Sequence, residues 1–142
     1  MEKTSGRLAW TGLSLRAQVE GAWCIAMPDV FSIRHTTVEH YLEPTVHEIK
    51  VRRADLLADL RKPLKGEAYR QIGGQCWYVL REGIGDADDV PACYGVMLAH
   101  DDGTIEVQRP APARAMKLPF GIWMALARAA PEPHDGDEQA GW

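Results

Sequence analysis

The run TVHEIKV at residues 45–51 has the composition of a core strand, yet it carries two charges. Side chains alternate between the two faces of a strand, so Glu48 and Lys50 share one face with Val46. Burying either charge alone costs several kcal/mol. One interpretation is therefore an edge strand whose charged face meets solvent. The other is a chemical site at the end of a core strand.

A second acidic residue favours the chemical site. Asp29 follows Pro28 at the start of another predicted strand, DVFSIR, and 18 residues separate it from Glu48. That separation suits a hairpin-like return that brings the two strand ends together. Two carboxylates at adjacent strand ends form a hard-oxygen site suited to Mg²⁺. Lys50 beside them can position a water and offset the charge of a phosphate.

The rest of the chain predicts one mixed α/β domain over residues 1–130, with a sheet of about four to six strands. A chain of 142 residues is long enough to bury a core. The expected elements are a helix at 8–20, strands at 22–27, 29–34, 45–51 and 75–80, helical segments at 54–64 and 65–72, a hairpin at 93–109, and a final helix at 118–130. The tail at 131–142 is polar, acidic and rich in Gly and Pro, so we expect it to be disordered.

Charge and hydropathy limit the classes of function. The net charge of −4 excludes a generally basic nucleic-acid coat, so any nucleic-acid surface must be local. No apolar run approaches 18 residues, and the N-terminus leads into no apolar signal core, so we expect no membrane span and no secretion. Three widely spaced cysteines fit reduced thiols in a cytoplasmic protein.

Basic residues are concentrated directly after the charged strand. They are either a solvated helix face or a patch that contacts DNA phosphates beside the site. The candidates for phosphate contact are Arg52, Arg53, Lys62, Lys65 and Arg70. Asp55 and Asp59, four residues apart in the same segment, are interpreted as helix-start residues and as ion-pair partners of the arginines.

The final helix has more apolar residues than one narrow stripe needs, which indicates either a packing helix or a homodimer surface. The histidines lack metal spacing with the cysteines, which excludes a zinc site.

The order of these motifs resembles a known family. Pro28-Asp29 followed by Glu48-Ile49-Lys50 is similar to the motif of the PD-(D/E)xK nuclease superfamily, which has the restriction-endonuclease-like fold. The stretch HEIKVRRADLLADLRKP, the aromatic strand QCWYVL and the acidic loop with Val90-Pro91 resemble, more narrowly, the MmcB-type DNA-repair nucleases and similar phage-borne proteins. The likeness covers about Trp23 to Pro110. It implies an α-β-β-β-α-β core, a mixed sheet flanked by helices, to which this chain adds a C-terminal hairpin and helix.

The resemblance also implies roles for individual residues. Asp29 and Glu48 would be metal ligands, and the backbone carbonyl of Ile49 would complete the protein's share. Lys50 would orient the attacking water. The metal would be Mg²⁺, for which Mn²⁺ could substitute.

Three further residues enter through the resemblance. Many members carry a glutamate on the first helix, for which Glu20 is the nearest candidate. Some relatives place a glutamine or tyrosine on the helix after the charged strand, and Tyr69 and Gln71 could serve here. Gln71 would hold a water or phosphate, and Tyr69 would stack or offer its hydroxyl.

The expected function is metal-dependent hydrolysis of DNA phosphodiester bonds, in DNA repair or phage DNA processing. One alternative is a catalytically silent nucleic-acid-binding or scaffold protein that retains the fold. A second is a nuclease that acts on RNA, because the sequence does not distinguish the two sugars.

Overall fold

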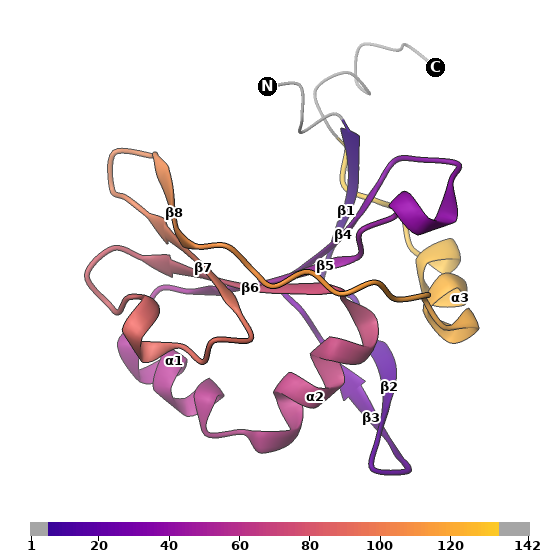
Figure 1. Cartoon of the computed structure of the whole chain (residues 1–142), viewed down its shortest axis with the longest axis horizontal. Helices are drawn as coiled ribbons and strands as arrows, with labels where there is room; N and C mark the ends of the chain where they lie inside the picture. The colour runs from indigo at the N-terminus through magenta and orange to yellow at the C-terminus, as the bar shows by residue number, and fades with distance from the viewer. Residues whose placement is uncertain (1–5, 134–142) are drawn as a thin grey trace.

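A six-stranded mixed sheet forms the centre of the computed structural model, which describes residues 6–133 (Figure 1). The strand order across the sheet is β1-β4-β5-β6-β7-β8. The bounds are Arg7–Thr11 for β1, Val30–Arg34 for β4, Thr45–Lys50 for β5, Gln75–Arg81 for β6, Gly95–Ala99 for β7 and Ile105–Arg109 for β8. The pairs β5–β6 and β6–β7 are parallel, and the other pairs are antiparallel. The prediction of a mixed α/β domain with such a sheet is confirmed.

Two helices connect the parallel strands β5 and β6. They are α1, Arg53–Leu60, and α2, Pro63–Ile72, and both lie on the same side of the sheet (Figure 1). Leu56 of α1 and Ile72 of α2 are completely buried, which fixes these helices on the sheet. Pro63 occupies the start of α2, where a missing N–H leaves no hydrogen bond unmade. The prediction of two helical segments is confirmed, but the break falls at residues 61–62, so that Pro63 begins the second helix instead of closing the first.

The predicted helix at residues 8–20 is wrong, because this segment forms strands. It contains β1 and β2, Leu15–Val19, and β2 pairs with β3, Ala22–Ala26, as a separate hairpin. Buried side chains alternate with exposed ones from Leu13 to Val19, which is the period of a strand and not of a helix. The turn at Glu20 and Gly21 has positive φ at both residues, as tight hairpins require.

The expected α-β-β-β-α-β order consequently lacks its first helix. A strand, β1, stands at the sheet edge beside β4, and the β2–β3 hairpin packs against α2 instead of joining the main sheet (Figure 1). What the structure establishes is a mixed α/β fold with one six-stranded sheet, one two-stranded sheet and three α-helices in residues 6–133.

The C-terminal hairpin and helix follow the prediction. β7 and β8 pair antiparallel around Gly103, whose φ of 93° is open to glycine. The last helix is α3, Phe120–Arg128, and its buried residues Ile122 and Leu126 lie on the side that contacts β2. The outer side exposes Phe120, and a homodimer through this helix stays a prediction.

The domain extends beyond the boundary expected at residue 130. The N–H of Glu132 donates to the carbonyl of Ala9 at 2.6 Å, and the Thr11 hydroxyl donates to the Glu132 carboxylate at 2.6 Å. The start of the expected tail is thus attached to β1, while the prediction of disorder at 134–142 lies outside the described residues. Between residues 6 and 133, no helix has the length and apolar character needed to cross a membrane.

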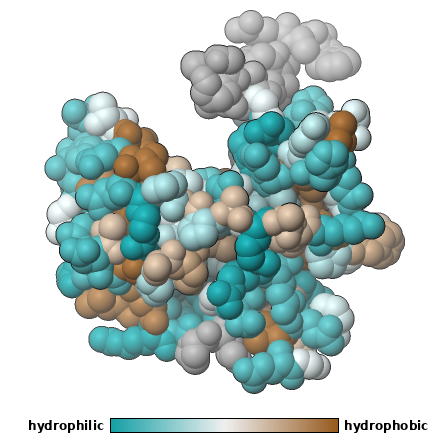
Figure 2. Space-filling model, viewed as in Figure 1, coloured by the Kyte–Doolittle hydropathy of each residue, from teal (hydrophilic) through white to brown (hydrophobic). Residues whose placement is uncertain are grey.

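Most of the surface seen in Figure 2 is hydrophilic. A brown patch lies over β8 at the upper left, where Ile105 and Val107 are 56% and 55% exposed on the edge strand.

Candidate active site

The structure brings Asp29 and Glu48 together at the junction of β4 and β5. Asp29 immediately precedes β4, whose neighbour β5 carries Glu48. The N–H of Asp29 donates to Glu48 Oε1 at 3.1 Å, and the N–H of Ile49 donates to Asp29 Oδ2 at 2.7 Å. These two hydrogen bonds hold the two acidic residues in a fixed relation. Asp29 is exposed, whereas Glu48 is only 3% exposed.

Lys50 lies on the same side of β5 as Glu48, as the strand period requires. Its Nζ is 3.7 Å from Glu48 Oε2, and its side chain is 15% exposed. The charged face of the strand is therefore not the solvated face of an edge strand. β5 lies inside the sheet between β4 and β6, and the face that carries Glu48 is buried.

A second lysine places a further positive charge beside the buried carboxylate of Glu48. Lys65 of α2 donates from Nζ to Glu48 Oε2 at 2.8 Å and to both carboxylate oxygens of Asp59 at 2.5 and 2.6 Å. The sequence predicts either that Lys65 lies on a solvated helix face or that it contacts a DNA phosphate beside the site. Its side chain is 22% exposed, and the two carboxylates occupy its ammonium group.

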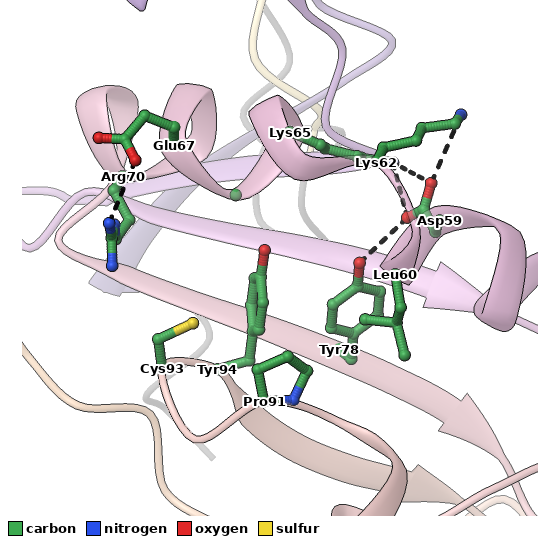
Figure 3. Close-up of a pocket in the computed structure, with 11 residues that line it drawn as sticks. Asp59, Leu60, Lys62, Lys65, Glu67, Arg70, Tyr78, Pro91, Cys93 and Tyr94 are labelled. Atoms are coloured by element: carbon green, nitrogen blue, oxygen red, sulfur yellow. Dashed lines mark hydrogen bonds and ion pairs between the residues drawn. The ribbon is translucent and has the colours of Figure 1, made fainter.

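Asp59 of α1 is the functional candidate that sequence reasoning missed. It is 5% exposed, and it binds Lys50 at 3.3 Å and the Tyr78 hydroxyl at 3.1 Å in addition to Lys65. Figure 3 shows the Tyr78 hydroxyl and the Lys62 side chain both directed at this carboxylate. One sequence signal could have found it. Asp59 is three residues after the buried Leu56, so it lies within the apolar stripe of the helix.

Two buried tyrosines border the charges. Tyr69 is 2% exposed, and the ammonium of Lys65 lies 5.4 Å from the centre of its ring. Burial, followed by the charge of Glu48, raises the pKa of Tyr69 far above its ordinary value. Burial and the nearby Asp59 do the same to the pKa of Tyr78. Both hydroxyls therefore stay protonated, so they can donate hydrogen bonds but cannot act as bases at neutral pH.

A small cavity of about 240 Å³ lies between α2 and the segment that leads into β7 (Figure 3). Asp59, Tyr78 and Tyr94 are among the residues that line it. A Cβ at Gly66 would meet the Tyr94 hydroxyl at 2.7 Å, so the glycine permits this close approach. Asp59 thus lines this cavity and also contacts the lysines.

Pairing shifts the pKa values of Asp59 and Lys65 in opposite directions. Burial by itself would raise the pKa of Asp59, but hydrogen bonds and charges from Lys65 and Lys50 outweigh it, and the pKa falls below the ordinary 3.8. Burial would lower the pKa of Lys65, yet its bonds to Asp59 and Glu48 raise it above 10.5. Both partners are consequently ionised at neutral pH.

Acid should remove the contribution of Asp59 to stability. A lowered folded-state pKa stabilises the fold at pH values above the unfolded pKa, and this stabilisation is lost as the pH falls through the folded pKa. In metal-free buffer, the difference in melting temperature between the wild type and Asp59→Asn should be constant from about pH 5 to 8 and should shrink below about pH 4. Circular dichroism melts measure it. An equal difference at about pH 3 and pH 7 would contradict the ion pairing.

Two of the three additional candidates lie away from the charged cluster. Glu20 is exposed in the β2–β3 turn, with a φ of 53°. The side-chain oxygen of Gln71 accepts from the N–H of Gln18 at 2.9 Å and so attaches the hairpin to α2. Within residues 6–133, no hydrogen bond or ion pair joins either residue to Asp29 or Glu48. Of the three, only Tyr69 is in the cluster.

The basic candidates differ in the carboxylates with which they pair and in how exposed they are. Arg53 binds both carboxylate oxygens of Asp89 and the carbonyl of Ile84, so it anchors the loop after β6. Arg70 pairs with Glu67 at 3.3 Å. Arg52 is exposed, and Lys62, whose side chain is 66% exposed, pairs with Asp59 at 3.8 Å.

The oxygen atoms of this site are of the kind that a divalent cation prefers, but those of Glu48 are already engaged in other contacts. Carboxylate and carbonyl oxygens of Asp29, Glu48 and Ile49 are the hard ligands that Mg²⁺ prefers. Each oxygen of Glu48 already accepts a hydrogen bond, one from the Asp29 N–H and one from Lys65. Across the described part of the chain, no three His, Cys, Asp or Glu side chains are grouped as a metal site. A cation bound here would require Lys65 to move off Glu48.

Comparison with known proteins gives no relative to reason from. No family model matches the chain, and neither does any curated protein or solved structure.

Proposed function

We propose that this chain is a metal-dependent nuclease that hydrolyses phosphodiester bonds of DNA, in DNA repair or phage DNA processing. The observation that carries the proposal is the interlocked pair of Asp29 and Glu48 at neighbouring strand ends, with Lys50 on the same face of β5. An exposed carboxylate beside a buried one, with ammonium groups within 4 Å, is an arrangement suited to reactions at a phosphate.

Each residue has a distinct task in this proposal. Asp29, Glu48 and the Ile49 carbonyl would hold Mg²⁺, or Mn²⁺ in its place. The bound ion would supply a Lewis acid and lower the pKa of water. Hydrolysis breaks one phosphorus–oxygen ester bond and builds negative charge on the phosphate oxygens. Lys50 would orient the attacking water and offset that charge.

Lys65 gives the site a second state. It contributes one positive charge to Glu48 and Asp59 in the metal-free chain. If Glu48 held a cation, Lys65 would keep Asp59 as a partner and could turn its ammonium toward a substrate phosphate. Lys65 would thus reach the phosphate from the cluster itself, not from an exposed helix face.

The same contact favours the alternative of a catalytically silent nucleic-acid-binding protein. If Lys65 stays on Glu48, it provides the cation internally and the carboxylates are unavailable to a metal. The two functions differ in whether divalent ions bind.

The test is a cleavage assay with the full chain on linear, nicked, single-stranded and branched DNA and on RNA, with Mg²⁺, Mn²⁺ or EDTA. We expect DNA to be cut with either metal and to stay intact in EDTA. Isothermal titration with Mn²⁺ on the same protein distinguishes the alternative. Binding of DNA without cleavage and without uptake of metal would establish the silent protein.

A further inference from the structure

The outer face of β3 exposes three large apolar side chains in a row. Trp23, Ile25 and Met27 are 67%, 66% and 60% exposed and share one face by strand alternation. On the opposite face, Ala26 is buried toward α2. Contiguous apolar exposure of this kind marks an interaction surface.

A groove of about 580 Å³ lies between the segment Cys24–Met27, at the end of β3, and the opposite side formed by α2 and the connection from α1 to α2. Ile25 and Met27 form its apolar side. Arg61 and Lys62 supply positive charge on the opposite side, where Lys65 also lines the groove with its ammonium paired to Glu48 and Asp59. The groove therefore combines an apolar wall with a cationic wall, although the whole chain is acidic.

The groove leads to the candidate active site. Met27 is two residues before Asp29, with only the buried Pro28 between them. At the other wall, Lys65 lines the groove and also binds Glu48. A ligand chain lying in the groove would consequently reach Asp29 and Glu48.

The two walls select one class of ligand. An unpaired nucleotide offers an apolar base face and a charged phosphate at once. Proteins bind single strands by combining a basic groove for the phosphates with side chains, usually aromatic, against which the bases lie, and here Ile25 and Met27 would contact the base face. In a duplex the base faces are stacked on one another, so β3 would gain nothing from its exposed apolar side chains. The volume falls within the range of about 300–1,000 Å³ of pockets that hold small molecules, which admits a nucleotide.

We propose that this groove binds an unpaired nucleic-acid strand and directs it to the Asp29–Glu48 pair. The inference that the substrate has a single-stranded segment rests on the proposed function, whereas the binding itself does not.

Binding is measured in EDTA, where no cleavage occurs, by fluorescence anisotropy of labelled strands of about 15 nucleotides. The ligands are oligo-dT, oligo-rU and a blunt DNA duplex of the same length. We expect the full chain to bind oligo-dT about tenfold or more tightly than the duplex. The oligo-rU arm identifies whether DNA or RNA is the preferred strand.

Variants separate the two walls. Ile25→Ser with Met27→Ser should weaken single-strand binding about tenfold and leave duplex binding unchanged. The matched control is Ile105→Ser with Val107→Ser on β8, which removes equally exposed apolar residues elsewhere and should change nothing.

Arg61→Ala with Lys62→Ala should weaken single-strand binding and reduce the salt slope by about 1.4, since each phosphate contact of a single strand contributes about 0.7. The control for charge is Arg81→Ala with Lys117→Ala, both exposed and outside the groove.

Equal affinity for oligo-dT and duplex, or groove variants that bind like the wild type, would overturn the proposal. So would light scattering that shows a dimer lost in Ile25→Ser, because a second copy would then occupy the groove. Single-strand binding through the groove without cleavage in any metal would retain this inference and refute the nuclease. If the groove variants cleave DNA as the wild type does, the nuclease proposal stands and the groove inference is refuted.

Discussion

Asp29→Asn should reduce cleavage by about 100- to 1,000-fold while the chain stays folded, a loss of about 3–4 kcal/mol of transition-state stabilisation. The substituted amide still accepts the hydrogen bond that the Ile49 N–H donates to Asp29, but it lacks the charge that a metal ligand supplies. Because Asp29 is exposed, we expect the melting temperature to change by less than about 2 °C. Initial rates and circular dichroism melts measure the two quantities.

Asp102→Asn is the matched control for this change. Asp102 is also exposed, and it also accepts a backbone N–H, that of Thr104 at 2.9 Å, but it lies in the β7–β8 turn. If the cleavage rate of Asp29→Asn is within about twofold of that of Asp102→Asn, Asp29 has no role in the reaction. Glu48 is less suitable for this test. It is buried and bonded to Lys65, so its substitution would also destabilise the fold.

Asp59→Ala should destabilise the fold by about 3 kcal/mol, the low end of the cost of breaking a buried ion pair. The low end applies because Lys50 and Lys65 remain 15% and 22% exposed and can turn toward water. The Tyr78 hydroxyl loses its acceptor as well. We expect the melting temperature to fall by roughly 10 °C at neutral pH. Calorimetry or denaturant unfolding measures the change.

Asp55→Ala provides the comparison on the same helix. Asp55 is exposed in the first turn of α1, where a carboxylate contributes about 0.3–1 kcal/mol through the helix dipole. If Asp59→Ala costs no more than Asp55→Ala, the buried network does not stabilise the fold.

Local pattern was sufficient to predict most elements that lie on the sheet. Alternation and apolar runs predicted β4, β5 and β6, and the turn residues predicted the β7–β8 hairpin. The proximity of Asp29 and Glu48 follows from the same reasoning, since both stand at ends of strands that pair. The helix predicted at residues 8–20 is wrong because every second residue from Leu13 to Val19 is apolar, which is the period of a strand.

Long-range partners of charged side chains could not be predicted in this way. A cluster of basic residues in the sequence does not show which of them turns inward. Arg53 reaches a loop 36 residues away, and Lys65 reaches back 17 residues to Glu48. Both contacts depend on how α1 and α2 lie on the sheet. A double substitution of Arg53 and Lys65 would therefore disturb a loop anchor and the buried network together, and would not isolate phosphate binding.

The neutrality of the buried network has a consequence for how the chain matures. Two carboxylates, Glu48 and Asp59, are balanced by two ammonium groups, Lys50 and Lys65. Many small metalloproteins reach their native state only with the ion bound, because the free energy of binding the ion supplies the free energy of folding. Here the balancing charges are the ammonium groups of Lys50 and Lys65, which belong to the chain itself. Newly made protein can therefore complete its core whatever the supply of divalent ions, and under the proposed function the ion supply would govern activity without governing how much folded protein survives.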